Sequence, residues 1–102
     1  MSILHIVNKS PFQDSTMNSC LAICSNQDSV ILIEDGVFGA LLTSPVASDI
    51  KKLSARGTRF YALTNDVVAR GLTEKLLPDV NLVSYQDFVS LSIECKQIQS
   101  WY

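Results

Sequence analysis

The sequence lacks the composition of a protein that binds nucleic acid directly. Its 102 residues include eight Lys and Arg against ten Asp and Glu, a net charge of −2, and only 18% of the residues are charged. The basic residues are scattered, and Lys51 and Lys52 form the single adjacent pair. Direct binding to nucleic acid depends on clustered Lys and Arg that meet phosphates. We therefore expect no direct contact with nucleic acid.

Long apolar runs are missing too. About five apolar residues precede Asn8, fewer than the ~7 to 15 of a signal-peptide core or the ~20 of a membrane-spanning helix. We therefore expect a cytoplasmic protein without membrane contact. The cysteines number three, which is odd, and in that compartment they are expected to be reduced thiols.

Cofactor motifs are absent as well. The sequence holds no GxGxxG segment, no Walker loop and no GxSxG segment. The nucleotide-binding and α/β-hydrolase classes therefore have no support from motifs, and we expect no cofactor.

What the chain does contain is an alternation of strand-like and helix-like segments. Short apolar runs rich in β-branched residues occupy Ile3–Val7, Ser29–Glu34, Arg59–Leu63 and Val80–Ser84. Runs that are apolar on both faces are typical of parallel strands covered by helices on both sides. The length suits one domain, residues 1–102. We predict a three-layer α/β/α fold with a mostly parallel sheet of four to five strands.

The predicted helices have recognisable ends. Ser10-Pro11 followed by Gln13 combines a cap, a proline suited to the first turn and a capping-box glutamine, which predicts a helix from Pro11 to about Cys24. Comparable signals predict further helices that begin after Ser44, at Asn65 or Asp66, and at Ser84. The segment after Cys95 can add a brief terminal strand.

Two segments suggest contact with other subunits. Residues 36–45, GVFGALLTSP, are apolar on every side of any helix they could form, which indicates burial. In so short a chain, part of that burial is expected to come from another subunit. The C-terminal Trp101-Tyr102 invites the same interpretation, because these residues are favoured as interface anchors.

Cys20 and Cys24 are the candidate reactive residues. Cβ atoms four residues apart on a helix are ~5 to 6 Å apart, too far for an easy disulfide. A structural zinc needs about four ligands, whereas Cys95 lies about 70 residues away and His5 lies inside a predicted strand, so no metal site is expected. The helical spacing also permits both thiols to be core residues, and it does not by itself show a reactive one.

Polar residues follow the ends of predicted strands, where open α/β sheets bind ligands. Ser10, Asp35 and Asp66 could line a pocket there, but we favour their use as helix caps. His5 has no obvious local partner, and we expect a core or interface histidine rather than a general base.

Several segments taken together resemble one family. They are LHIVNKSPF at residues 4–12, ILIEDGV at 31–37, YALTNDVVARGL at 61–72, YQDFVSL at 85–91, and a tryptophan near the C-terminus. In this order they resemble the DsrH/TusB family, the small subunits of the DsrEFH and TusBCD sulfur-relay complexes. The resemblance implies a DsrE-like fold. It also implies a cytoplasmic heterohexamer with DsrE/TusD-like and DsrF/TusC-like subunits, which passes persulfide sulfur to a small DsrC/TusE-like carrier protein.

The resemblance also separates the cysteines. DsrH-type chains carry a cysteine in the first helix and TusB-type chains lack one, so Cys20 is the candidate sulfur acceptor, whereas Cys24 and Cys95 match no family motif and are expected to be packing residues. The main persulfide cysteine is expected on a partner subunit. Cys20 favours a DsrEFH-like role in dissimilatory sulfur oxidation. The alternatives are a TusB-like role in supplying sulfur for 2-thiouridine at the tRNA wobble position, or a subunit for assembly alone.

Overall fold

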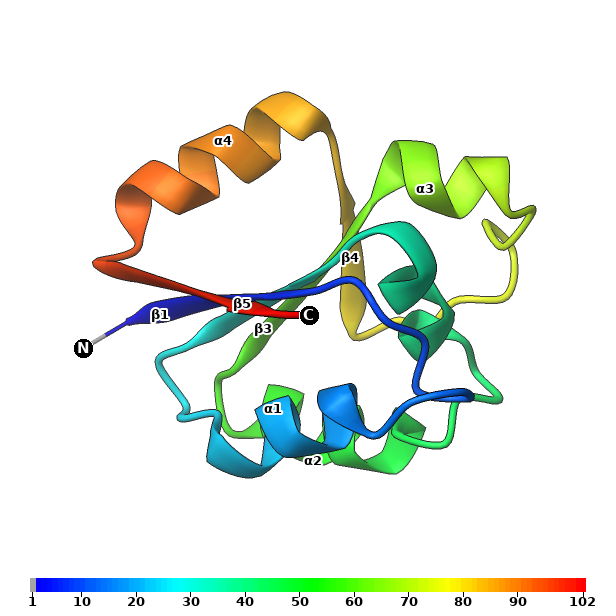
Figure 1. Cartoon of the computed structure of the whole chain (residues 1–102), viewed down its shortest axis with the longest axis horizontal. Coiled ribbons are helices and arrows are strands. Elements are labelled where there is room, and N and C mark those ends of the chain that lie inside the picture. Colours follow the sequence, from blue (N-terminus) through cyan, green and yellow to red (C-terminus); the bar gives the residue numbers. More distant parts are fainter. Residues whose placement is uncertain (1) are drawn as a thin grey trace.

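A five-stranded sheet crosses the computed structural model, which describes residues 2–102 (Figure 1). Its strands are β1 (Ile3–Val7), β2 (Ser29–Leu32), β3 (Arg59–Leu63), β4 (Val80–Val83) and β5 (Gln97–Trp101). They lie in the order β4-β3-β2-β1-β5, and every neighbouring pair is parallel. The prediction of a mostly parallel sheet of four to five strands is confirmed. The terminal strand is also confirmed, and it pairs with β1.

Helices cover both faces of this sheet, as predicted. Helices α1 (Thr16–Ile23) and α2 (Ala47–Ala55) lie together on one face, and α4 (Tyr85–Glu94) lies on the other (Figure 1). A 3-10 helix, η1 (Glu34–Ala40), and the short α3 (Thr64–Ala69) begin directly after β2 and β3. The apolar run of β2 is buried at every position, because this central strand is covered from both sides.

The first helix begins later than the sequence predicted. It starts at Thr16 rather than at Pro11, because the chain first makes a turn in which the Ser10 carbonyl accepts the N–H groups of Gln13 and Asp14. The Asp14 carboxylate then accepts the Thr16 N–H at 2.7 Å and satisfies a free donor of the first turn. The helix therefore begins after Asp14 and not after the predicted cap at Ser10.

The predicted start of the last helix agrees with the structure. Ser84 and Asp87 form the two reciprocal bonds of a capping box, each 3.1 Å, at the start of α4. The predicted strand through Glu34 is too long by two residues. Glu34 adopts a φ of 50°, and this turns the chain out of β2 and into η1.

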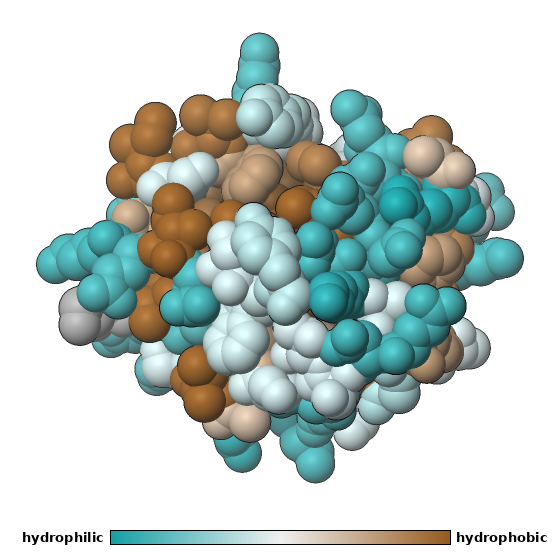
Figure 2. Space-filling model, viewed as in Figure 1, coloured by the Kyte–Doolittle hydropathy of each residue, from teal (hydrophilic) through white to brown (hydrophobic). Residues whose placement is uncertain are grey.

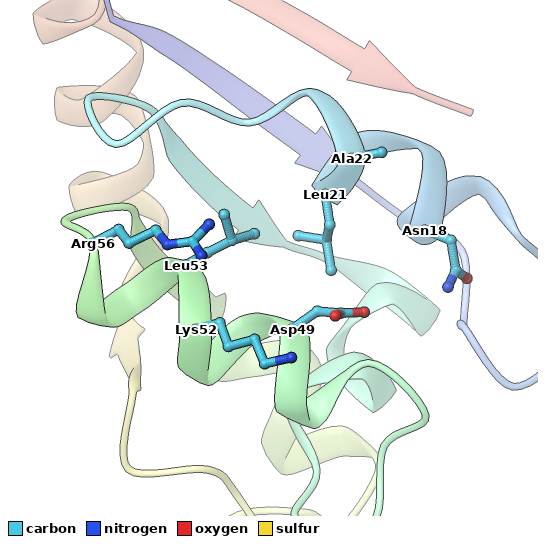
Figure 3. Close-up of a pocket in the computed structure, with 7 residues that line it drawn as sticks. All are labelled: Asn18, Leu21, Ala22, Asp49, Lys52, Leu53 and Arg56. Carbon is cyan, nitrogen blue, oxygen red and sulfur yellow. The ribbon is translucent and has the colours of Figure 1, made fainter.

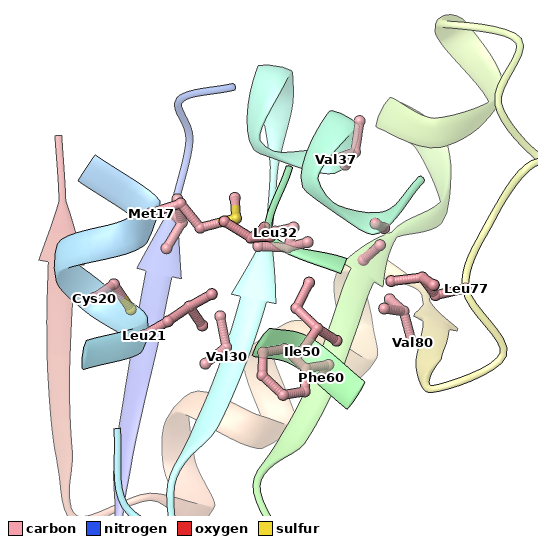
Figure 4. Packing of buried hydrophobic residues seen from close by; sticks show 14 of the residues in the cluster. Met17, Cys20, Leu21, Val30, Leu32, Val37, Ile50, Phe60, Leu77 and Val80 are labelled. Atoms are coloured by element: carbon pink, nitrogen blue, oxygen red, sulfur yellow. The ribbon is translucent and has the colours of Figure 1, made fainter. Parts of the chain in front are cut away.

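The larger apolar core lies between the sheet and the helices α1, α2 and η1 (Figure 4). Val37 and Ala40 of η1 are buried in it, so the chain itself covers much of the apolar segment 36–45. Gly36 allows the close approach, because a Cβ there would lie 2.2 Å from the Val7 carbonyl oxygen. Leu42 is still 57% exposed, and it is the part of this segment available to another subunit.

The opposite face is covered less completely. None of the residues of α4 is buried, and Ile93 on it is 79% exposed. Figure 2 shows apolar side chains gathered over this part of the molecule. Among residues 2–102, no helix has the length and apolar character needed to cross a membrane.

Candidate functional site

Two of the three cysteines meet at the C-terminal end of α1. Cys20 lies within the helix and Cys24 ends it, with φ and ψ of −64° and 136° that lead the chain away in an extended conformation. Their sulfur atoms are 4.0 Å apart. Cys20 is 0% exposed between α1 and the sheet (Figure 4), whereas Cys24 is only partly buried. Only the second thiol is open to solvent.

His5 lies beneath these thiols, in the middle of β1. It is buried, and its Nε2 is 2.9 Å from Oδ2 of Asp28, the residue that precedes β2. Trp101, the last residue of β5, donates its indole N–H to Nδ1 of His5 at 3.1 Å. The expectation of a core histidine is therefore confirmed, and its partners are distant rather than local in the sequence. Its partners come from the two strands that pair with β1, 23 and 96 residues away in the sequence.

These partners determine the protonation of His5. The Asp28 carboxylate can only accept, so Nε2 carries a hydrogen, and the indole can only donate, so Nδ1 is unprotonated. The contacts therefore select the neutral imidazole with its hydrogen on Nε2. Burial lowers the pKa of His5, but the neighbouring Cys24 and Asp28 outweigh burial and raise that pKa above its ordinary value.

Asp28 is held in turn by the backbone. Its carboxylate accepts the N–H groups of Ile3 and Ser25, each at 3.1 Å, in addition to the bond with His5. Burial would raise the pKa of Asp28, but the hydrogen bonds from His5, Ser25 and Ile3 lower it. A buried, ionised carboxylate is thus kept in place to orient the imidazole.

His5, Cys20 and Cys24 together form what we call the thiol cluster, in which one nitrogen and the two sulfur atoms all lie within 4.8 Å of one another. A hydrogen bond from Cys20 and the nearby His5 lower the pKa of Cys24 to about 6, although burial acts in the opposite direction. The same contact with Cys24, together with burial, raises the pKa of Cys20. The electrostatics of the pair therefore favour deprotonation of Cys24 over deprotonation of Cys20.

The thiol cluster also supplies three groups of the kind that bind metals. His5 comes from within a strand, and the packing of α1 on β1 brings it beside the two cysteines. A structural zinc takes four ligands, and both nitrogens of His5 are already engaged by Asp28 and Trp101. As it stands, the arrangement is suited to thiol chemistry.

Two surface hollows adjoin α1. One, of about 360 Å³, is lined by His5, Ile3 and Ile23 together with Gln97, Ile98 and Gln99 of β5. Ile23 is 62% exposed at its rim and directly precedes Cys24. The other, of about 270 Å³, lies between α1 and α2, and is lined by Leu21 from α1 and by Leu53, Asp49, Lys52 and Arg56 from α2 and its end (Figure 3). Its lining offers charges of both signs but no thiol or imidazole, so the first hollow is the one connected with the thiol cluster.

The polar residues after β2 and β3 hold the fold together. Asp66 lies inside α3 rather than capping it, and its carboxylate instead accepts the N–H of Glu34, the first residue of η1, at 2.8 Å. Asp35 is instead in an ion pair with Arg70, at 2.9 Å. The Ser10 hydroxyl accepts the Phe12 N–H within a turn rather than at the start of a helix. None of the three residues therefore caps the helix that it was predicted to open.

Comparison with solved structures shows which fold the chain shares. The ychN protein from E. coli superposes with a TM-score of 0.89 at 12% identity over 98% of both chains. A protein from Methanobacterium thermoautotrophicum superposes with a TM-score of 0.73 at 23% identity over 96% of both. At such identities the likeness shows a shared α/β fold.

Sequence comparison gives the family. The model of the DsrH like protein family matches residues 9–98, and the chain belongs to this family. It is 35% identical to protein TusB of Sodalis glossinidius (strain morsitans) and 32% identical to protein TusB of Pectobacterium parmentieri, in each case over 97% of this chain and 100% of the relative. The expected resemblance is confirmed, and membership supports the expected role as a sulfur-relay subunit.

The partners of His5 were the residues that sequence reasoning missed. Asp28 directly precedes β2, and parallel pairing of β2 with β1 brings it beside Ile3 and His5. The adjacency of two predicted parallel strands was thus a usable signal. Trp101 was noted only as an interface aromatic, although its ring packs beside His5 with the ring centroids 6.1 Å apart.

Proposed function

We propose that this chain is a TusB-like subunit of a sulfur-relay complex that supplies sulfur for 2-thiouridine at the tRNA wobble position. The observation that carries the proposal is the match to TusB proteins at 30 to 35% identity over 97% of the chain. These relatives favour the tRNA pathway over the sulfur-oxidation pathway that Cys20 suggested. TusC-like and TusD-like subunits are the proposed partners in a heterohexamer, and a small TusE-like carrier receives the sulfur.

The thiol cluster supports a part in sulfur transfer. A thiolate is the form of cysteine that attacks a persulfide, and an imidazole held by a carboxylate is a group that stabilises a thiolate. The resemblance assigned the sulfur to Cys20. For Cys20 to accept it, the C-terminal end of α1 has to open, because the Cys20 thiol is fully buried.

The uncovered apolar side chains support assembly with other subunits. Val89 and Ile93 on α4 are exposed, as are Leu42 after η1 and the C-terminal Tyr102. Exposed apolar residues that form a patch mark interaction surfaces. We therefore expect the isolated chain to aggregate and the chain co-expressed with its partners to elute as a defined complex.

One observation favours a second candidate, a DsrEFH-like subunit in dissimilatory sulfur oxidation. Cys20 stands in α1, at the place where DsrH-type chains carry a cysteine. On this alternative, the carrier that receives the sulfur is DsrC-like.

The proposal can be tested by complementation. A bacterial strain without its TusB gene is given this chain together with the TusC-like and TusD-like subunits from the same source, and tRNA 2-thiouridine is measured by mass spectrometry. We expect thiolation to return, as it does with the strain's own TusB as the matched control. If an intact complex forms but thiolation stays absent, the tRNA pathway is wrong. A chain that binds neither partner is not such a subunit.

A further inference from the structure

We infer that Cys24 is the sulfur-accepting thiol of this chain, with Cys20 as its hydrogen-bond donor and the Asp28-held His5 as the group that positions and stabilises it. This inference rests on the proposed sulfur-relay function and deepens it, because it moves the site from the residue that the family pattern indicates to one that the pattern does not include.

Access is the first reason. A persulfide on a partner subunit can be attacked only by a sulfur that it can reach. Cys20 is 0% exposed beneath α1, whereas Cys24 ends the helix and is partly open. The residue before it, Ile23, lies on the rim of the hollow that His5 lines. A donor that docks over this end of α1 meets Cys24 before Cys20.

The surroundings of Cys24 are the second reason. The titratable groups that face it are Cys20 from α1, His5 from β1 and Asp28 from the turn before β2. Cys20 and His5 favour the Cys24 thiolate, and the Asp28 carboxylate opposes it while holding His5 in place. The net result is a thiolate near neutral pH on Cys24 and a protonated thiol on Cys20.

Trp101 affects how strongly His5 stabilises the Cys24 thiolate. Its indole N–H occupies the lone pair on Nδ1 of His5, which is the position where His5 would take a proton. The indole therefore holds down the basicity of the imidazole, and with it the stabilisation that an imidazolium would give the thiolate. Trp101 is in this respect a positioning residue rather than a catalytic one.

The transfer step is a balanced exchange that needs no oxidant. The Cys24 thiolate attacks the outer sulfur of a partner's cysteine persulfide, and a new sulfur–sulfur bond forms as the donor's own bond breaks. The donor cysteine leaves as a thiolate and takes up the proton that Cys24 had released. The product is a Cys24 persulfide whose outer sulfur the next thiolate in the relay can take.

The raised pKa of Cys20 protects this product. Attack by Cys20 on the inner sulfur would expel sulfide, close a Cys20–Cys24 disulfide and end the transfer. Such an attack requires the Cys20 thiolate, which burial and the contact with Cys24 disfavour. The two neighbouring thiols thus have different tasks, one as an acceptor and the other as a donor of a hydrogen bond.

Persulfide loading of the full chain tests the inference. The chain, alone or with its partners, is treated with glutathione persulfide in the presence of a chelator, and fragment masses locate the added sulfur atom on Cys20, Cys24 or Cys95. We expect it on Cys24. Cys24→Ser should lose the adduct by about tenfold or more, whereas the matched variant Cys95→Ser should load as the wild type does.

The pH dependence of alkylation gives a readout that needs no variant. Iodoacetamide should react with Cys24 with a midpoint of about 6, while Cys95, whose pKa burial raises, serves as the reference in the same sample. His5→Gln should slow the reaction of Cys24 about fivefold at about pH 6, because less thiolate remains. A Cys24 that titrates together with Cys95 overturns the inference, as does an adduct confined to Cys20.

Failure of the inference and failure of the proposed function are distinguishable. If Cys24→Ser restores tRNA 2-thiouridine as well as the wild type does, the inference is overturned and the function stands. If Cys24 is loaded but the wild-type chain never restores 2-thiouridine, the proposed tRNA pathway fails while the thiol assignment is kept.

Discussion

The thiol cluster beneath α1 and the polar residues that follow β2 and β3 are both assembled from distant parts of the sequence. In the second region, Asp35 pairs with Arg70 and Asp66 caps η1, at the surface and with each charge satisfied by an opposite charge or a backbone donor. In the thiol cluster, the sulfur atoms of Cys20 and Cys24 are in contact with each other and lie close to the His5 imidazole, under a helix. At the edge where α/β sheets usually bind ligands, Asp35 and Asp66 are thus engaged in contacts within the chain, while the thiol cluster lies under a helix on one face of the sheet.

The largest expected effect is a difference in the free energy of unfolding between substitutions in the two regions. Asp28→Ala should lower the free energy of unfolding by about 3 kcal/mol, because it leaves the N–H groups of Ile3 and Ser25 and the His5 Nε2–H without their acceptor. Asp35→Ala should cost at most about 1 kcal/mol, since that ion pair is exposed. Urea unfolding measures both. Equal losses would show that burial does not distinguish the two carboxylates.

A pH effect on stability should follow from the same carboxylate. The pKa of Asp28 is lower in the folded protein than its ordinary value of 3.8, so its contribution is complete above that value and is lost as the pH falls through the folded-state pKa. Urea midpoints should therefore drop on acidification in the wild type. Asp28→Asn should flatten this part of the curve, whereas Asp35→Asn should not. An unchanged curve for Asp28→Asn would contradict the assigned pKa shift.

A smaller effect, on the alkylation rate of Cys24, is expected from substitution of Trp101. Trp101→Phe keeps the ring beside His5 but deletes the N–H that occupies Nδ1, so His5 becomes more basic and the pKa of Cys24 falls further. Alkylation of Cys24 at about pH 5 should become about twofold faster. Tyr102→Phe, at the exposed neighbouring residue, is the matched control. A slower reaction in Trp101→Phe would show that the indole supports the thiolate rather than limiting it.

The smallest effect is expected from the surface ion pair. Arg70→Gln removes the partner of Asp35 and should change stability by about 1 kcal/mol or less, without altering the alkylation rate of Cys24. Rates measured beside Cys95 in the same sample check this. A changed Cys24 rate would mean that the two regions are coupled through the sheet.

Much of the fold could be predicted because local signals agreed with it. The apolar runs located β1 to β4, and Ser84 with Asp87 located the start of α4. The start of α1 was missed because two caps competed, and Asp14 bonds Thr16 while Ser10 only closes a turn. Such a competition depends on small energy differences that a motif does not express.

The candidate site was predictable only in part. The sequence pointed to the first-helix cysteines, and family resemblance chose Cys20, whose burial became visible only in the folded chain. The two thiols lie on one helix face, so periodicity treats them alike. Their difference comes from the end of α1 at Cys24, where the chain turns away and leaves that sulfur partly open above His5.

The sequence by itself determined the alternation of strands and helices, the family, and the presence of two thiols four residues apart. Those properties depend on local patterns of apolar residues, caps and motifs. Only the tertiary structure decided which thiol is buried and which is partly exposed. Parallel pairing of β1 with β2 and β5 brings Asp28 and Trp101 to His5, and packing of α1 on the sheet places that imidazole beside Cys24. Burial and hydrogen bonding then separate the pKa values of two otherwise similar cysteines, and both are properties of long-range packing.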